Sequence, residues 1–502
     1  MAANATAVWR VRPSGSNTNG GGYDAGISGA GTDYSQQNAA QVSQSSTANT
    51  STATTTLTDL GASFTSALIG NAIRVSGTGI TTTYTFIIPP VTSTTLTLQT
   101  SPGTTGTAVS YSIGGGWADF WTNTTSSGPV VPGNTIYVLG SGVPNPALYN
   151  YDYSPSTYIN IVSGSATAGR VAIIGDPNTP SSGVPCIKVP GILFNGQNYG
   201  NFANLWFVLS SGGSNGIFSN ASIVLATNVV LDQYGYDGCF NNTGIGIYIV
   251  ASEAFSSRTK QSTNVNYVLG TNFGTLISGC NIHNCIGPAL LIANGGAVTD
   301  TLITKNGGAG LTINPGGGYG SSIKNCTIDG NLGSGVVFTT QTGLANANLF
   351  NCIISNHTQS GTYGMTVSAG TTSANNLIKG FVDYNTYWNN TTDLNVISYG
   401  AHDTSNSGSA PILSTTNPYR QQPPMSTNGA TAAGNNTLHF ASVPATVLAG
   451  MPILDTTAPT VLVGLTVVST TSTTVVMSGN ASGAGVGNGD SIVFAPEDYT
   501  LV

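Results

Sequence analysis

The sequence predicts an all-β protein whose central part is a parallel β-helix, a solenoid flanked by a small β module at each end. Two observations support this prediction. Only 11 Lys and Arg plus 18 Asp and Glu residues occur among 502, and four similar segments recur at intervals of 21, 25 and 26 residues. Exposed helix faces need many charged residues, so the chain cannot cover many helices. A hydrophobic fraction of 39% still favours a folded chain over a disordered one.

The first 54 residues are predicted to form an N-terminal arm and leader. No basic region followed by an apolar run of about 7 to 15 residues is present, so we expect no secretion signal. Residues 35–54 are rich in Ser, Thr, Gln and Asn, a composition typical of a linker.

Two segments outside the solenoid share one spacing and predict a small β module at each end, residues 55–115 and 430–502. Successive apolar positions are separated by 16, 23 and 15 residues in the first copy and by 15, 22 and 17 in the second. These positions are Leu57, Ile73, Leu96 and Tyr111, then Leu438, Ile453, Val475 and Ile492. Residues 411–429 are predicted to be a Pro-rich linker before the second module.

The parallel β-helix is predicted over residues 125–410. Its clearest repeats have a central isoleucine, and each is followed by a second short strand. The four isoleucines are Ile282, Ile303, Ile328 and Ile354. A repeat of this length cannot bury its apolar face alone and must stack on copies of itself. Equivalent residues would lie about 4.8 Å apart, so these isoleucines should form an interior ladder.

Asparagine and histidine residues follow the ladder positions. Asn306 and Asn331 are expected to stack in the turns, because Asn tolerates the left-handed conformation and its side chains can bond along the stack. His283 and His357 are expected to be exposed turn residues. Tyr384, Tyr387 and Trp388 are expected to cover the last coil, with a sugar-binding platform as the alternative.

The repeats resemble the right-handed parallel β-helix family that includes pectate lyases and bacteriophage tailspikes, and the right-handedness is implied by that resemblance. Asn134 begins a strand similar to the entry strand common in these proteins. The pattern Phe64, Ile69, Gly70 and Ile73 is similar to a small β domain of phage tail fibres and tailspikes, whereas the C-terminal copy keeps only Gly450 and Ile453. The N-terminal leader also looks like those of phage-encoded β-helix proteins.

Several classes of partner are excluded or disfavoured. A net charge of −7 without any Lys/Arg run argues against nucleic acid. No apolar run approaches about 18 residues, which argues against a membrane span. The six cysteines form no CxxC pair, so neither a metal site nor a cofactor is expected. Cys326 and Cys352 would be ladder neighbours, and interior packing is favoured over a disulfide.

Candidate functional residues are few. Asp329 has His283, Thr304 and Ser355 at the corresponding repeat positions, so the paired carboxylates that glycoside hydrolysis requires do not align. We therefore predict no catalytic residue. Charges and aromatic rings concentrate in one segment, residues 232–260, which includes an insertion expected to project as a loop. Its glycan-binding candidates are Asp232, Tyr234, Tyr236, Asp237, Glu253, Arg258 and Lys260, with a merely solvated loop as the favoured alternative and catalysis as the least favoured one.

The functional hypothesis is a non-enzymatic structural protein on the exterior of a bacteriophage virion, as a capsid decoration or fibre-like appendage, with host-glycan adhesion as an added role. Its expected partners are other virion proteins and host surface polysaccharide. The resemblance also leaves open a homotrimer, although the sequence has no heptad run. The alternative is a tailspike-type polysaccharide depolymerase, either a glycoside hydrolase or a lyase.

Overall fold

The structure is a computed structural model of the chain. It describes residues 6–45, 50–53, 55–81, 83–103, 106–124, 128–141, 151–155, 159–160, 162, 164–165, 167, 169–179, 184–189, 192–193, 198–209, 218–219, 222–232, 240–241, 247–255, 269–271, 275–285, 287–293, 295–314, 320–339, 347–367, 382–395, 401–406, 425–444, 447, 453–458, 460–462 and 465–494. The chain divides into two compact units, Met1–Ser409 and Ala410–Thr500, and each is described by itself.

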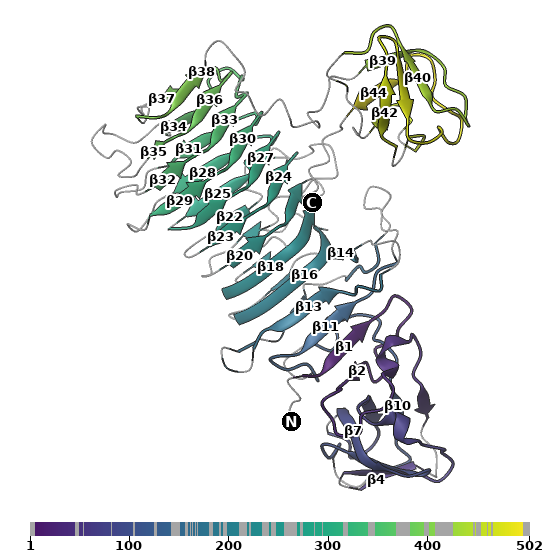
Figure 1. Cartoon of the computed structure of the whole chain (residues 1–502). Helices are drawn as coiled ribbons and strands as arrows, with labels where there is room; N and C mark the ends of the chain where they lie inside the picture. Colours follow the sequence, from purple (N-terminus) through teal and green to yellow (C-terminus); the bar gives the residue numbers. More distant parts are fainter. Residues whose placement is uncertain are drawn as a thin grey trace. The chain divides into compact units, whose positions relative to one another are not determined.

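The first unit contains a parallel β-solenoid, as predicted, whose strands stack coil upon coil (Figure 1). One solenoid sheet has 20 described strands: β1 (Val8–Val11), β2 (Gly22–Tyr23), β11 (Thr135–Val138), β13 (Val171–Gly175), β14 (Cys186–Val189), β16 (Asn198–Leu209), β18 (Ser222–Asp232), β20 (Ile247–Val250), β21 (Glu253–Phe255), β23 (Leu276–Ser278), β24 (Asn281–His283), β26 (Ala297–Thr299), β27 (Leu302–Thr304), β29 (Ser321–Lys324), β30 (Thr327–Asp329), β32 (Ala347–Phe350), β33 (Ile353–Ser355), β35 (Val382–Asp383), β36 (Thr386–Trp388) and β38 (Thr404–Asn406).

A second solenoid sheet has ten described strands that pair in parallel: β12 (Ile159–Asn160), β15 (Ile192–Leu193), β17 (Phe218–Ser219), β19 (Phe240–Asn241), β22 (Leu269–Thr271), β25 (Leu290–Ala293), β28 (Leu311–Asn314), β31 (Val336–Phe338), β34 (Met365–Val367) and β37 (Leu394–Asn395). These are the second strands that the repeats predicted.

The interior aliphatic ladder is confirmed. Ile282 pairs in register with Ile303, Ile303 with Ile328, and Ile328 with Ile354. All four side chains are fully buried in the hydrophobic core of the solenoid, and Tyr387 continues the row at the next coil. Burial of such side chains stabilises the fold by about 1.5 to 3 kcal/mol each.

A polar ladder lies inside the solenoid beside this apolar row. The Asn306 amide donates to Asn331 Oδ1 at 2.8 Å, as expected of stacked asparagines, and the Asn331 amide donates to the carbonyl of Ile303 at 3.1 Å. His357 occupies the next step of the same ladder and is fully buried, and His283, the last residue of β24, is only 7% exposed, so the expectation that both are exposed turn residues was wrong. The ring nitrogens of His357 lie 3.2 to 3.3 Å from the carbonyls of Ile328, Asn331 and Gly333, contacts that only the stacking of coils creates.

Cys326 and Cys352 lie on adjacent coils as buried thiols. The hydrogen bond between the two thiols, together with burial, raises the pKa of Cys326. The structure thus contains the expected interior packing of these side chains.

The N-terminal strand β1 differs from the expected free leader, because it forms part of the solenoid. Val8–Val11 pairs in parallel with β11, so residues 8–11 precede the predicted entry strand in the sheet. Trp9 stacks on Trp117 with centroids 4.7 Å apart, and its indole N–H donates to Asn134 Oδ1 at 2.9 Å. These contacts join segments more than 100 residues apart and cover the first coil with aromatic surface.

The N-terminal β module is an eight-stranded sheet with its own core, and it begins earlier than the predicted boundary at residue 55. Its strands are β3 (Val42–Gln44), β4 (Thr50–Ala53), β5 (Thr56–Asp59), β6 (Ala72–Ser76), β7 (Tyr84–Val91), β8 (Thr95–Leu98), β9 (Gly106–Thr107) and β10 (Ser110–Ile113), with 3₁₀ turns η1 (Tyr34–Gln36) and η2 (Ser66–Leu68).

The second unit contains a six-stranded antiparallel module with strands β39 (Met425–Gly429), β40 (Thr437–Phe440), β41 (Ile453–Asp455), β42 (Val467–Thr470), β43 (Thr474–Met477) and β44 (Ser491–Phe494). The module begins before the predicted boundary at residue 430, because β39 lies within the predicted linker 411–429 and pairs with β40 and β44. The two modules share the register that the spacing predicted. Leu57 pairs with Leu96 in the first, and Leu438 pairs with Val475 in the second. Additional β modules at both ends of the solenoid sequence are thereby confirmed.

Candidate functional site

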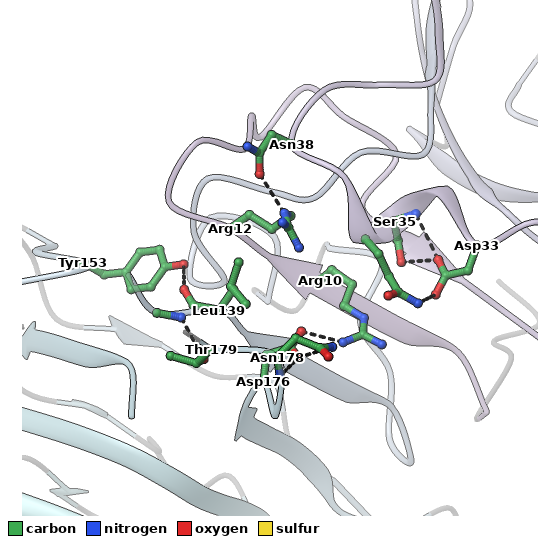
Figure 2. Close-up of polar contacts among 12 residues, drawn as sticks. Arg10, Arg12, Asp33, Ser35, Asn38, Leu139, Tyr153, Asp176, Asn178 and Thr179 are labelled. Carbon is green, nitrogen blue, oxygen red and sulfur yellow. Dashed lines mark hydrogen bonds and ion pairs between the residues drawn. The ribbon is translucent and has the colours of Figure 1, made fainter. Parts of the chain in front are cut away.

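A cluster of charged side chains lies where β1 meets the first coils (Figure 2). Arg10 donates to Asp176 Oδ2 at 2.6 Å, and its guanidinium lies 4.5 Å from the centre of the Tyr137 ring. The other oxygen of Asp176 accepts from the backbone and side chain of Asn178. Both carboxylate oxygens are therefore engaged: Oδ2 joins β1 to the solenoid through Arg10, and Oδ1 fixes the local turn at Asn178. This cluster is structural.

The predicted glycan-binding patch lies largely outside the described residues, which include only Asp232 and Glu253 from it. Asp232 ends β18 and pairs with Phe255 of β21, whereas Glu253 pairs with Val230 and Asn281. The backbones of the two acidic residues thus belong to adjacent, paired strands, and the expectation of a projecting loop was wrong for residues 253–255, which form β21 of the solenoid sheet. Tyr234, Tyr236, Asp237, Arg258 and Lys260 fall in undescribed segments, so the patch stays a prediction.

A second surface is formed by five three-residue strands stacked in register: β24, β27, β30, β33 and β36. The central residue of each strand is buried inside the solenoid. The flanking side chains point away from this core, because side chains alternate along a strand. Their exposure differs: Asp329 and Trp388 are partly exposed, whereas His283, Thr304 and Ser355 are buried. We call the outward side chains of these strands the outer strip. One row of it runs through His283, Thr304, Asp329, Ser355 and Trp388.

Residues in the left-handed conformation border the outer strip on both sides, where each coil turns a corner. The first ridge precedes the strands, and the second ridge follows them. The first comprises Ala251, Gly279, Asp300, Asn325, Asn351 and Tyr384, and the second comprises Asn284, Lys305, Gly330, Asn356 and Asn389. Asn and Gly dominate both ridges because they adopt positive φ at the lowest cost.

Amide side chains on the ridges form hydrogen-bonded ladders that end on a carboxylate. On the first ridge, Asn351 donates to Asn325 at 2.9 Å and Asn325 donates to Asp300 at 3.0 Å. A similar ladder on the second ridge runs from Asn389 through Asn356 to Asp329. Each amide donates towards the preceding coil. An aspartate is suited to the end of such a ladder because its carboxylate only accepts.

Asp329 is the carboxylate at the centre of the outer strip. Its Oδ1 accepts from Ser355 Oγ at 2.7 Å and from Asn356 Nδ2 at 2.6 Å, so these described bonds leave Oδ2 to other donors. Lys305 lies one coil earlier on the second ridge. Burial lowers the pKa of Lys305, and the charge of Asp329 partly offsets that effect.

An aromatic group lies at the end of the first ridge. Tyr384 is 47% exposed, its ring stacks on His402 with centroids 4.4 Å apart, and it contacts Phe350 at 5.0 Å. Asp383 accepts from His402 Nδ1 at 2.8 Å and from the backbone N–H of Tyr384 at 2.9 Å. Desolvation acts to raise the pKa of Asp383, but the hydrogen bonds from His402 and Tyr384 together outweigh it and lower the pKa. Asp383 thus holds both rings in place.

The outer strip and its ridges therefore combine amides, a carboxylate and a lysine with the exposed ring of Tyr384 and the half-buried ring of Trp388 at one end. Amides and carboxylates bond sugar hydroxyls, and flat rings pack against the apolar faces of sugars, so the composition suits a saccharide. The neighbours of Asp329 in its row are Thr304 and Ser355, so no second carboxylate lies next to Asp329 in that row. Within the described part of the chain, no group of three or more His, Cys, Asp and Glu side chains is arranged to hold a metal ion.

Sequence reasoning considered Tyr384 and Trp388 as a platform but missed Lys305, Asn356 and His402. Trp388 is half-buried in the outer strip, whereas Tyr387 is buried inside the solenoid. A signal for Lys305 was present, since it occupies a turn position that holds Asn or Gly in the other repeats. His402 carried no such signal because it lies outside the repeats.

Comparison with known proteins identifies the fold. A family model described as a right handed beta helix region matches residues 191–378. Among curated proteins, no sequence matches the chain. Within the described residues, no helix has the length and apolar character needed to cross a membrane.

Solved structures that align with this chain at low similarity include phage tailspikes and a polysaccharide epimerase. The tailspike of Acinetobacter baumannii bacteriophage AP22, solved with a capsular saccharide, is 11% identical over 90% of this chain and 82% of that one, with a TM-score of 0.27. The tailspike of Pseudomonas phage phi297 is 11% identical over 91% of this chain and 80% of that one, with a TM-score of 0.23.

The A-module of the mannuronan C-5 epimerase of Azotobacter vinelandii is 13% identical over 55% of this chain and 91% of that one, with a TM-score of 0.20. Similarities this low do not transfer a function. Together with the stacked parallel sheets, the family match shows that this chain is a right-handed parallel β-helix protein with additional N- and C-terminal β modules.

Proposed function

We propose that this protein is an external component of a bacteriophage particle that binds a surface polysaccharide along the outer strip. The observation that carries the binding role is the pair of rings, Tyr384 and Trp388, that flank the end of two amide ladders. Tyr384 is held in the left-handed conformation at φ 60°, which a tyrosine adopts only at a cost, and its ring stays exposed. The phage assignment rests on the resemblance of the leader and end modules to phage appendage domains.

The spacing of the outer strip supports binding of a chain rather than a single sugar. Successive coils lie about 4.8 Å apart, so the partly exposed Asp329 and Trp388, two coils apart, are separated by roughly 10 Å along the stack. The ridge residues Asn325, Asn351 and Tyr384 continue at one per coil beside them. A linear polysaccharide lying parallel to the stack would contact groups from several coils.

The test is a binding titration with bacterial surface polysaccharides immobilised on an array. Trp388→Ala and Tyr384→Ala should each weaken binding by about tenfold, the loss of one ring contact, whereas Trp388→Phe should retain most of it. Leu60→Ala is a matched control, because Leu60 is 69% exposed in the N-terminal module, away from the strip. Unchanged binding in both ring variants would refute the site. Labelling the protein in electron micrographs of particles tests the location.

The second candidate is a polysaccharide depolymerase, and the proximity of Lys305 to Asp329 is the observation that favours it. A lysine whose pKa is lowered by burial more readily acts as a general base, the role that β-elimination requires. Release of unsaturated sugars or reducing ends, abolished by Lys305→Gln while binding persists, would establish it. Binding without any product would support the non-enzymatic role.

The patch at residues 232–260 remains a separate proposal for glycan adhesion. Deleting residues 256–266, which leaves strand β21 in place, should lower binding on the same array if this insertion contributes. Binding that survives the deletion but not Trp388→Ala would assign recognition to the outer strip.

A further inference from the structure

One face of the Tyr384 ring is covered by another side chain. The rings of Tyr384 and His402 are stacked, with centroids 4.4 Å apart and an angle of 11° between their planes. Tyr384 is 47% exposed in total, but two rings at this separation leave no room for a sugar between them. Stacking of a sugar on this face of Tyr384 therefore requires His402 to move away.

His402 belongs to the last part of the solenoid that the structure describes, residues 401–406, which we call the terminal coil. Its strand β38 pairs in parallel with β36, and the backbone of Asn406 lies in register with Trp388. The terminal coil therefore lies beside both Tyr384 and Trp388. We call the rings of these two residues the ring platform.

The terminal coil is attached to the solenoid by polar contacts. Ser405 pairs with Tyr387, which continues the interior apolar row, yet Ser405 is exposed and its hydroxyl donates to Asp393 at 2.6 Å. Within the described residues, no member of the hydrophobic core of the solenoid comes from the terminal coil. Segments with few buried apolar contacts open at a low free energy. The terminal coil can thus open while the preceding coils stay folded.

Asp383 holds His402 over the Tyr384 ring. The carboxylate of Asp383 is buried, and it accepts from the backbone N–H of His402 at 2.6 Å and lies 2.8 Å from Nδ1 of the imidazole. Both of its oxygens therefore contact the same residue of the terminal coil. Hydrogen bonds of this kind exchange with bonds to water at a small net free energy, so the contact is reversible.

We propose that the terminal coil is a gate over the ring platform, which is closed while Asp383 holds His402 on Tyr384 and opens before a polysaccharide stacks on that ring. This inference rests on the proposed polysaccharide-binding function and specifies how that site is regulated. In the closed form, the imidazole occupies the place of a sugar. The measured association constant is that of the open form multiplied by the fraction of the protein that is open.

A reversible covalent lock tests the gate in the full chain. Thr386 and Thr404 pair in register, and their hydroxyl oxygens lie 3.0 Å apart at the surface. The double variant Thr386→Cys with Thr404→Cys should form a disulfide on oxidation that joins the terminal coil to β36. In titrations with the polysaccharide that binds best on the array, the oxidised protein should bind about tenfold more weakly than the reduced protein. Wild-type protein given the same two treatments is the control and should bind equally after both.

His402→Ala tests the gate without a disulfide and decides the question if the cysteine pair does not oxidise. Removing the imidazole uncovers the Tyr384 face, so affinity should rise about twofold to tenfold, the range expected for one aromatic pair. His402→Phe is the matched control, because it keeps a ring over Tyr384 and should bind no more tightly than wild type. In a Tyr384→Ala background, His402→Ala should no longer raise affinity.

Amide hydrogen exchange of the full chain measures opening without any ligand. The backbone N–H of Thr404 donates to the carbonyl of Asn385 at 2.8 Å, and that of Thr386 donates to the carbonyl of Cys352 at the same distance. The two amides thus report on the terminal coil and on the coil before it. Thr404 should exchange at least about tenfold faster than Thr386, and Asp383→Asn should increase the difference.

The outcomes separate the gate from the binding function. Binding that depends on Tyr384 but is the same in the oxidised and reduced pair and in His402→Ala would overturn the gate and leave the binding function intact. Equal exchange of Thr404 and Thr386 would also overturn the gate. Absence of binding to any polysaccharide would overturn the binding function and, with it, the gate. Weaker binding by the locked protein together with tighter binding by His402→Ala would establish the inference.

Discussion

Replacing Asn331 with alanine should destabilise the solenoid far more than replacing an asparagine on its surface. Asn331 is 2% exposed and accepts from the backbone and side-chain amides of Asn306 at 3.0 and 2.8 Å. Its own amide donates to the carbonyl of Ile303 at 3.1 Å. The side chain therefore serves groups on two neighbouring coils.

The expected loss of stability follows from the buried polar groups that the substitution leaves without a hydrogen-bond partner. Asn331→Ala removes the partner of the Asn306 backbone N–H and of the Ile303 carbonyl, both in the solenoid interior. A buried polar group without a partner costs about 1 to 3 kcal/mol, so the free energy of unfolding should fall by roughly 2 to 6 kcal/mol. The Asn306 side-chain amide keeps its bond to the carbonyl of Ile282, which limits the loss.

Asn325→Ala is the comparison, because Asn325 forms part of an amide ladder on the exposed first ridge. Asn325→Ala should lower the free energy of unfolding by only about 1 to 2 kcal/mol, mainly because alanine disfavours the left-handed conformation of this position. The urea concentration at the unfolding midpoint, measured by circular dichroism, reports the stability of both variants. The comparison holds if the dependence of the unfolding free energy on urea concentration is the same in both. An Asn331→Ala protein no less stable than Asn325→Ala would refute the reasoning.

Three further predictions concern the cap and the buried histidine. Trp9→Ala should lower the free energy of unfolding by about 3 to 5 kcal/mol, because the Trp9 side chain is 1% exposed. Urea unfolding tests this. A loss no larger than that of a surface substitution would contradict the role of Trp9 in covering the first coil. Arg10→Ala should cost about 3 to 5 kcal/mol, since Asp176 would stay buried without its cation, and Arg10→Ala with Asp176→Ala should recover part of the loss in thermal unfolding. Burial lowers the pKa of His357, so the unfolded state binds more protons and stability should fall as the pH drops below about 6.5 and level off below the folded pKa. His357→Asn should flatten that part of the stability–pH curve, and an unchanged curve would exclude His357 as its source.

Much of the solenoid was predictable because its information is local and repeated. Ile282, Ile303, Ile328 and Ile354 recur in a constant context, so their alignment alone identified the residues that pair in the structure. The repeat also predicted the Asn306 and Asn331 stack. The burial of His357 was not predictable from residue type, because histidine is common at exposed turns and only its alignment with Asn331 reveals the interior position.

The candidate site was less predictable because register assembles it. Lys305, Asp329 and Trp388 are separated by 24 and 59 residues in the chain, and no motif links them. They share one surface only because β27, β30, β33 and β36 stack in register. The search for paired carboxylates in the sequence aligned Asp329 with its row neighbours Thr304 and Ser355, but it did not consider Lys305 on the neighbouring ridge.

The sequence by itself determined the all-β class, the parallel stack and the duplicated end module, since each depends on a period or spacing that residues along the chain carry. Only the tertiary structure decided that β1 covers the first coil, that His357 is interior, and that Tyr384, Lys305 and Asp329 border one strip. These features depend on contacts between segments distant in sequence, where hydrogen-bond register and burial, rather than local preference, select the partner.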